Sequence, residues 1–341
     1  MNATRKPASR RARRALAVVP VVCLSLVLAA CGRDGGDTTA APGATGGGGG
    51  QKLTIAVVPG STGYFYWGSL HAGAKAAADE LGAELVWRGT ATQSDITGQT
   101  NILQDFVNRK VSGIAFAAND TKALAPIVEQ AAAAKIPIVS ADAGIDPQSI
   151  PLIATDNENA AGQAADFIGE KLGGKGKVAL LPFLATSATS QAREKGFTDR
   201  LTEKYPDIEI VAKKYTDGDV NKSLTIMNDV LSAHPDLNAV FGLNEPSVIG
   251  TIRALEAKKA TGVTVVGFDN APDEVKALKD GTVAALVVQD PYKIGYESVM
   301  TLKKMIDGGK GENVDTGATL VTQDNINDPK IEKLINPPVE K

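Results

Sequence analysis

Short β-branched runs alternate with alanine-rich segments of helical periodicity from Lys52 onward, and this alternation constrains the fold more than any other feature. Repeated βα units predict parallel sheets covered by helices on both faces, because strands buried on both sides read as near-continuous apolar runs. The predicted strands are Leu53–Val58, Glu84–Trp87, Gly113–Ala117, Ile136–Ala141, Leu152–Thr155, Val178–Pro182, Glu209–Ala212, Ala239–Leu243, Val263–Phe268, Val283–Val288 and Ala318–Thr322. Apolar residues at three- and four-residue spacing predict helices that include Gly68–Leu81, Asp95–Arg109, Leu124–Ala134, Ala160–Leu172, Gln191–Tyr205, Lys222–Ala233, Val248–Lys259 and Tyr292–Asp307.

Eleven strands fit better in two sheets than in one, so we predict an α/β fold with two similar, doubly wound parallel-sheet lobes. Asp156-Asn157 follows a strand near the midpoint and marks the first predicted crossing between the lobes. With a hinge of several strands, the N-terminal lobe spans 52–156 plus 290–318. The C-terminal lobe then spans 157–289 plus 319–335.

The first 30 residues read as an export leader. Six basic residues precede the apolar stretch Ala15–Ala30, which Pro20 interrupts and which is too short for a comfortable membrane span of about 20 residues. Leu28-Ala29-Ala30-Cys31-Gly32 then resembles a bacterial lipobox, which implies cleavage before Cys31 and lipidation of that cysteine. An uncleaved anchor helix is the alternative, and Arg10-Arg11 also suggests a twin-arginine signal. We expect an exported protein, lipid-anchored at the outer face of the cell membrane or periplasmic.

Residues 31–51 have almost no apolar side chain to bury and include the run Gly46 to Gly50. We interpret this segment as a flexible, glycine-rich tether. A phosphate-binding glycine loop is the alternative, but no strand precedes the run and no helix follows it immediately.

Charge and cysteine content narrow the function. The leader holds six of the 36 basic residues and none of the 39 acidic ones, so the mature chain has a formal charge of −9 (30 basic against 39 acidic residues). A nucleic-acid partner is therefore not expected, because no basic surplus meets phosphates. Cys23 lies in the leader and Cys31 carries lipid, so no disulfide is expected.

Polar side chains follow several predicted strands where those strands end. Asp142, Asn244, Asp269 and Gln289 hold such positions, and the first strand leads to an aromatic cluster that includes Tyr64, Tyr66 and Trp67. Ligands of open α/β sheets bind outside the carboxyl ends of the strands. Carboxylates and amides can pair with neighbouring hydroxyls, and aromatic faces pack against the C–H faces of a sugar ring. The set predicts a site for a neutral, polyhydroxylated ligand.

Each of these residues also has a purely structural interpretation. Asn244 and Asp269 stand where helix N-caps would be, and Asp142 could simply open a turn. The aromatic cluster could belong to the core, and Gln289 could be an ordinary loop residue beside Pro291.

The order and spacing of these pieces carry a family resemblance. From about Lys52 to Asn325 the chain resembles the ribose-type periplasmic sugar-binding proteins, the solute receptors of sugar ABC importers. The matching pieces are Thr54-Ile55-Ala56-Val57-Val58 with the aromatic group, Ile136-Pro137-Ile138-Val139 before Asp142, Ala192-Arg193-Glu194-Lys195-Gly196-Phe197, Ala233-His234-Pro235-Asp236, Asn244, Val266-Gly267-Phe268-Asp269, and Gln289 with Pro291.

The resemblance implies that Tyr66 and Trp67 stack on the sugar ring and that Tyr64 makes a polar contact. It further implies that the sugar hydroxyls bond to Asp142, Arg193, Asn244, Asp269 and Gln289. Without the family resemblance, Arg193 would be interpreted as a solvated cation on a helix face.

Two departures make ribose itself uncertain as the ligand. Ribose receptors have an arginine where Ala143 stands and an aromatic residue where Gly218 stands, so this pocket is expected to be wider. Trp87-Arg88-Gly89-Thr90 and Ala118-Asn119-Asp120-Thr121 look nearer to relatives that bind other small carbohydrates, including autoinducer-2. The expected ligand is a monosaccharide or polyol.

Enzyme activity is the main alternative class. The mature chain has only His71 and His234, without a recognisable nucleophile setting or metal cluster, although Asp142 and Asp269 could be imagined as a glycosidase pair. Gly60-Ser61-Thr62-Gly63 lacks the lysine of a P-loop and the third glycine of a dinucleotide site. We therefore predict a monomeric binding protein without cofactor or metal that delivers its ligand to the membrane permease of an ABC importer. A receptor that reports a sugar or signal to a membrane sensor, without transport, is the alternative.

Overall fold

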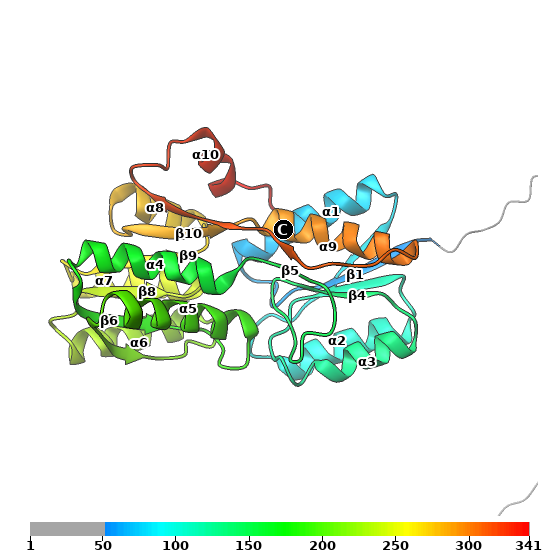
Figure 1. Cartoon of the computed structure of the whole chain (residues 1–341), viewed down its shortest axis with the longest axis horizontal. Helices are drawn as coiled ribbons and strands as arrows, with labels where there is room; N and C mark the ends of the chain where they lie inside the picture. Colours follow the sequence, from blue (N-terminus) through cyan, green and yellow to red (C-terminus); the bar gives the residue numbers. More distant parts are fainter. Residues whose placement is uncertain (1–51, 341) are drawn as a thin grey trace, which may run out of the picture. The chain divides into compact units, whose positions relative to one another are not determined.

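The computed structural model describes residues 52–340, so the predicted leader, Cys31 and the tether lie outside the described residues. Six strands form the first sheet in the order β11-β5-β4-β3-β1-β2, and every neighbouring pair in it is parallel. Figure 1 labels β1, β4 and β5 of this sheet. These strands are β1 (Thr54–Val58), β2 (Glu84–Trp87), β3 (Gly113–Phe116), β4 (Ile138–Ala141), β5 (Leu152–Ala154) and β11 (Val314–Asp315). The sequence did not predict β11, which has only two residues.

The second sheet repeats the strand order of the first. Its order is β12-β10-β9-β8-β6-β7, so the first five strands of each lobe occupy equivalent places. The strands are β6 (Lys175–Leu181), β7 (Asp207–Lys213), β8 (Ala239–Gly242), β9 (Thr264–Phe268), β10 (Ala285–Gln289) and β12 (Ala318–Thr322). The predicted pair of doubly wound parallel-sheet lobes is confirmed, with one exception at an edge.

That exception is β12, which pairs antiparallel with β10. The carboxyl ends of both sheets face the other lobe. The chain leaves β11 at the carboxyl end of the first sheet. If it crosses directly, it enters the second sheet at the carboxyl ends of that sheet's parallel strands. It therefore runs opposite to its neighbours, and the connection needs only Thr316 and Gly317.

Helices cover both faces of each sheet. In the first lobe, α2 (Ile96–Asn108) and α3 (Ala125–Ala133) pack in one core cluster, and α1 (Phe65–Glu80) and α9 (Pro291–Ile306) pack in another. In the second lobe, α4 (Asn157–Lys171) and α5 (Ala188–Lys204) share one cluster. The opposite face is covered by α6 (Val220–Ala233), α7 (Glu245–Lys258), α8 (Pro272–Asp280) and α10 (Pro329–Ile335), of which α8 and α10 were not among the named predictions.

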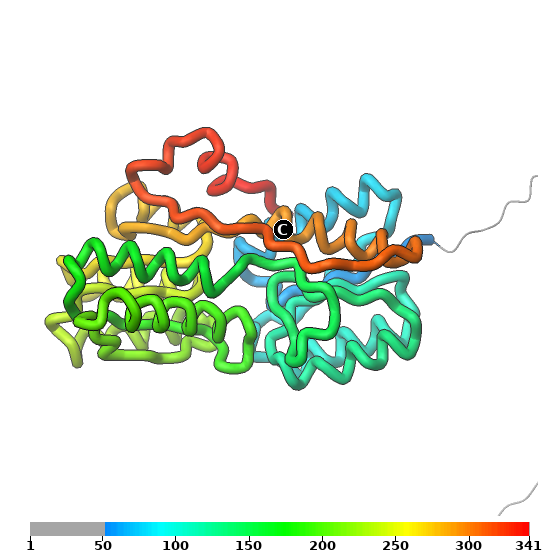
Figure 2. Tube along the Cα trace, viewed as in Figure 1, coloured from blue at the N-terminus to red at the C-terminus, as the bar shows by residue number. Residues whose placement is uncertain are grey.

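The chain passes between the lobes at three places close together: after β5, after β10 and between β11 and β12. At the first crossing Asp156 caps α4 by accepting from the Asn159 backbone N–H. The C-terminal tail adds a further contact, because α10 packs on the second lobe while the Glu340 N–H donates to the Gly68 carbonyl on α1 (Figure 2). Within residues 52–340 no helix is long and apolar enough to span a membrane.

Two glycines allow α1 and α9 to pack backbone against backbone. A Cβ at Gly73 would overlap the Tyr292 carbonyl oxygen, and a Cβ at Gly295 would overlap the Leu70 carbonyl oxygen. Since neither obstacle is a flexible side chain, the helices would have to move apart to admit even a methyl group. The close approach matters for function because the first turn of α1 carries the predicted aromatic residues.

We expect Gly73→Ala to lower the free energy of unfolding by about 1–3 kcal/mol through overpacking. Gly162→Ala is the matched control, because it lies within α4 and its Cβ would find Arg200 Nη2 at 3.5 Å as its nearest atom. That variant should be neutral or gain up to about 1 kcal/mol from helix propensity. Urea unfolding of both variants measures the difference, and equal stabilities would show that the helices separate without cost.

Candidate functional site

Asp142 and Asp269 hold equivalent places in the two lobes. Each directly follows the fourth strand of its sheet, β4 or β9, and each has a left-handed backbone, with φ of 74° and 82°. Such φ values are uncommon outside glycine, and aspartate is among the residues that tolerate them. The turn ends each strand sharply and leaves the carboxylates only 7% and 4% exposed, in the space between the lobes.

The aromatic residues come from the first turn of α1. Tyr66 packs edge-to-face on Trp67 with ring centroids 5.0 Å apart, and the Tyr66 hydroxyl donates to Asp142 Oδ1 at 2.5 Å. The Tyr64 hydroxyl donates to the Gly218 carbonyl in the other lobe, also at 2.5 Å. Gly60 makes room for this cluster, since a Cβ there would lie 2.6 Å from the Trp67 ring.

Arg193 on α5 is 2% exposed, so it is a buried cation of the site and not a solvated residue of a helix face. Its Nε donates to Asn157 Oδ1 at 2.7 Å, and its Nη1 donates to the Leu243 carbonyl at 2.6 Å. The guanidinium carbon lies 3.8 Å from the centroid of the Phe268 ring, a cation–π contact. All of these partners belong to the second lobe, which therefore fixes the cation by itself.

The capping interpretation holds for Asn244 and fails for Asp269. Asn244 Oδ1 accepts from the Ser247 N–H at the start of α7, which leaves its Nδ2 on the pocket side. Asp269 does not cap α8, whose N-cap is Ala271. Its two oxygens accept instead from Gln289 Nε2 at 2.7 Å and from the Glu245 N–H at 2.9 Å.

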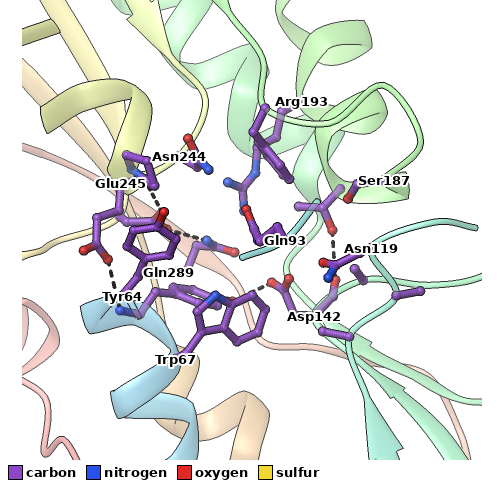
Figure 3. Close-up of a pocket in the computed structure, with 18 residues that line it drawn as sticks. Tyr64, Trp67, Gln93, Asn119, Asp142, Ser187, Arg193, Asn244, Glu245 and Gln289 are labelled. Carbon is purple, nitrogen blue, oxygen red and sulfur yellow. Dashed lines mark hydrogen bonds between the residues drawn. The ribbon is translucent and has the colours of Figure 1, made fainter. Parts of the chain in front are cut away.

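Figure 3 shows how these side chains surround one pocket between the lobes. The pocket is lined by all eight residues that the sequence singled out for the ligand: Tyr64, Tyr66, Trp67, Asp142, Arg193, Asn244, Asp269 and Gln289. Ala143, the predicted departure from ribose receptors, lines it as well.

Sequence reasoning missed five polar residues that also line this pocket: Gln93, Asn119, Ser187, Thr189 and Glu245. Asn119 was quoted only within a motif of the first half, although it follows the third strand of its sheet much as Asn244 follows the third strand of the other. That equivalence of strand order is the signal that could have found it. Gln93 lies in the irregular segment between β2 and α2, where no periodic pattern singles it out.

Glu245 joins the two lobes. Its carboxylate accepts from the backbone N–H groups of Phe65 and Tyr66 at 3.2 and 3.1 Å, at the N-terminus of α1. Helix α1 has no side-chain cap and no acidic residue in its own first turn, so the other lobe supplies the negative charge that a helix N-terminus favours. No sequence pattern indicates this role, because an acidic residue at the start of α7 already suits that helix.

Further hydrogen bonds connect the lobes beside the pocket. Thr189 Oγ1 donates to the Asp142 carbonyl at 3.2 Å, and Thr186 Oγ1 donates to the Asn119 carbonyl at 3.0 Å. The Thr121 N–H in turn donates to the Thr186 carbonyl at 3.0 Å. The rim of the pocket is therefore closed by direct contacts between the lobes.

Burial raises the pKa of each pocket carboxyl group. It raises the pKa of Asp142 to about 6, although Arg193 and the Tyr66 hydroxyl both act to lower it. Burial also raises the pKa of Asp269 against the opposing influence of Arg193. The pKa of Glu245 rises to about 7 through burial, offset in part by the N–H groups of Tyr66 and Phe65 and raised further by the charge of Asp269.

The site offers many hydrogen-bonding groups and no metal-binding cluster. Within the described residues, no group of three or more His, Cys, Asp or Glu side chains could hold a metal ion. Gln289 Oε1 is buried and lacks any hydrogen-bond partner there. An unpaired buried acceptor is costly, so its position in the pocket points to a ligand that carries a hydroxyl donor.

Comparison with known proteins agrees with this geometry. Residues 55–310 match the family described as the periplasmic binding protein domain. The ribose import binding protein of Salmonella typhimurium is 33% identical over 260 residues, which cover 76% of this chain and 86% of that protein.

Two solved structures extend the comparison. A carbohydrate transporter solute-binding protein from Agrobacterium radiobacter, in complex with D-arabinose, is 35% identical, with a TM-score of 0.81 over 84% of this chain and 99% of that one. An ABC transporter solute-binding protein from Agrobacterium vitis with bound D-fucose is also 35% identical, with a TM-score of 0.80 over 83% of this chain and 99% of that one.

The family and these relatives are solute-binding transport proteins and not enzymes, and the chain is a two-lobed solute-binding protein of the extracytoplasmic type. The chain belongs to the ribose-type periplasmic sugar-binding proteins.

The raised pKa of Glu245 predicts a pH-dependent stability. A carboxyl group whose pKa is raised by folding adds stability below its unfolded value, near 4.5, and loses that contribution as the pH rises through about 7. Glu245→Gln cannot lose a proton, so its stability relative to the wild type should rise by about 2–3 kcal/mol between pH 5 and pH 8. Urea unfolding at both pH values measures this difference.

Glu203→Gln, at an exposed position of α5, controls for the loss of one acidic residue. If Glu245→Gln followed the same pH dependence as this control, burial of Glu245 would not be the source of the effect.

Proposed function

We propose that this protein captures a small carbohydrate, a monosaccharide or polyol, between its two lobes and delivers it to the permease of an ABC importer. The observation that carries the proposal is the convergence of eight ligand-type side chains from both lobes on one pocket. Family membership and the sugar-binding relatives from the two Agrobacterium species support the same function.

Each residue has a role in the proposal. Tyr66 and Trp67 pack against the C–H faces of the sugar ring, and Tyr64 supplies a polar contact. The sugar hydroxyls exchange hydrogen bonds with Asp142, Arg193, Asn244, Asp269 and Gln289. Carboxylate oxygens and Gln289 Oε1 accept from hydroxyls, while Asn244 Nδ2 and the guanidinium donate to them.

The ligand need not be ribose. Ala143 lines the pocket without offering a cation, and Gly218 offers only its backbone. Relatives of this chain bind ribose, D-allose or D-arabinose, and one more distant relative is a xylitol-binding protein of Mycolicibacterium smegmatis.

Binding and lobe closure are linked in this proposal. The three crossings lie close together and serve as the hinge, with lobes of 52–156 plus 290–318 and 157–289 plus 319–335. Only when the lobes meet do both halves of the hydrogen-bonding set engage one ligand, so the ligand selects the closed form. The permease then recognises that form.

The leader and the cysteine extend the proposal to location. We infer that residues 1–30 are removed and that lipid on Cys31 holds a monomer at the outer face of the cell membrane, with 31–51 as the tether. The lipobox-like sequence Leu28-Ala29-Ala30-Cys31-Gly32 supports this inference.

A thermal-shift screen of the purified protein tests the binding function directly. Pentoses, hexoses, deoxysugars and sugar alcohols are the panel, and a ligand at one hundred times its Kd stabilises the folded state by about 2.7 kcal/mol. No shift with any carbohydrate would contradict the proposed ligand class. Loss of uptake of the identified sugar on deletion of the gene would distinguish transport from sensing.

Asp142→Ala and Asp269→Ala should each weaken binding of the identified sugar by about 1–3 kcal/mol, because hydroxyls and buried partners lose their acceptor. Calorimetric titration measures this loss, and neither variant should unfold. If affinity stayed unchanged in both variants while stability fell, the two aspartates would be structural and the assigned site would be wrong.

Cys31→Ala should abolish lipid attachment, because no thiol remains at the cleavage site. Metabolic labelling with palmitate and membrane fractionation measure the change, with the unaltered protein as the control. An unaltered protein that took up no palmitate label yet stayed in the membrane fraction would support an uncleaved anchor helix instead.

A further inference from the structure

Gln93 is a buried amide that the protein does not satisfy. It lies between β2 and α2, it is 8% exposed, and it lines the pocket between the lobes (Figure 3). Its Oε1 is fully buried and has no hydrogen-bond partner within residues 52–340. Buried side-chain oxygens are nearly always paired, so this exception calls for a donor from outside the chain.

A second glutamine six residues further along shows that the fold can satisfy a buried amide in this region. Gln99 Nε2 donates to the carbonyls of Pro59 and Ala117 at 3.1 and 2.8 Å. Gln99 Oε1 accepts from the Asn119 N–H at 3.1 Å. Hydrogen bonds to nearby backbone groups therefore account for the burial of the Gln99 amide. No such bonds account for the burial of the Gln93 amide.

The amide of Gln93 reaches from one lobe to the other. A Cβ at Gly60, in its own lobe, would lie 3.1 Å from Gln93 Nε2. A Cβ at Gly218, in the second lobe, would overlap Gln93 Oε1, and Gly218 has a φ of 64° that favours glycine. Gln93 therefore fills the space that a side chain at position 218 would take, beside the pocket amide of Asn244.

We propose that Gln93 is a specificity-determining residue of this pocket and that its Oε1 accepts a hydrogen bond from one particular hydroxyl of the ligand. The assignment rests on the proposed carbohydrate-binding function. Gln289 Oε1 is the other fully buried pocket acceptor that has no partner within residues 52–340, so the ligand class is a sugar or polyol with free hydroxyls at both positions. A sugar that is deoxygenated at the Gln93 position leaves this acceptor unpaired and is rejected.

Calorimetric titration of the purified protein tests this assignment with a protein-by-ligand cycle. The ligands are the sugar that gives the largest shift in the carbohydrate screen and the series of its monodeoxy analogues. The wild type should bind one of these analogues about 10-fold more weakly because Gln93 loses its donor. Gln93→Met should bind the parent sugar about 10-fold more weakly and should no longer distinguish that one analogue from the parent, while it still rejects the others.

Two further variants make the result specific. Gln93→Asn keeps the amide on a shorter side chain and should recover part of the discrimination. Gln104→Met makes the same chemical change on α2, where the amide bonds only Asn108 of the same helix, and should bind every ligand like the wild type. Unfolding midpoints of Gln93→Met and the wild type should agree closely, since the chain itself loses no hydrogen bond.

The results that would contradict the Gln93 assignment differ from those that would contradict the proposed function. If Gln93→Met bound the parent sugar like the wild type, or kept its full discrimination against every analogue, this assignment would be wrong. The proposed function would still stand. A wild type that bound no carbohydrate at all would overturn the proposed function and this assignment with it.

Discussion

Arg193 is the buried charge on which the rest of the pocket depends. Removing a carboxylate from water without a nearby cation costs several kcal/mol, and this pocket buries Asp142 and Asp269 together. The positive charge of Arg193 acts to lower the pKa of both. Asn157, Leu243 and the Phe268 ring all belong to the second lobe, so this lobe orients the guanidinium by itself. Asp142 comes from the first lobe, so contact between the lobes places its carboxylate near a cation that the other lobe orients.

Helix α1 contacts the other lobe and also carries side chains that line the pocket. The first turn of α1 carries the ring-stacking candidates Tyr66 and Trp67, and Glu245 of the other lobe accepts from the N–H groups of that turn. Gly73 lets this helix pack backbone against backbone on α9, a helix of the same lobe. A ligand against the rings and a carboxylate at the helix end therefore favour one arrangement of the two lobes.

Whether a pocket residue could be predicted depends on whether its signal lies in the sequence around it. Asp142, Asn244, Asp269 and Gln289 were found because parallel strands bring their carboxyl ends to one edge, a rule that needs only strand positions. Arg193 required the family resemblance, since a cation on a helix looks the same in sequence whether water or a pocket surrounds it. Gln93 and Glu245 were missed because their neighbours in space come from segments more than 100 residues away in the chain: Gly218 for Gln93, and Phe65 for Glu245.

The sequence by itself determined the two-lobed α/β architecture, since the alternation of apolar strands and amphipathic helices permits few other ways to bury both faces of a sheet. It also determined which residue types lie at the strand ends, and therefore the polar, aromatic character of the pocket. Only the tertiary structure decided which of those groups remain unpaired. Gln99 and Gln93 are the same residue type, six positions apart, yet one is fully bonded and the other is not. Hydrogen-bond satisfaction depends on atoms brought together by folding, and a pattern along the chain does not record it.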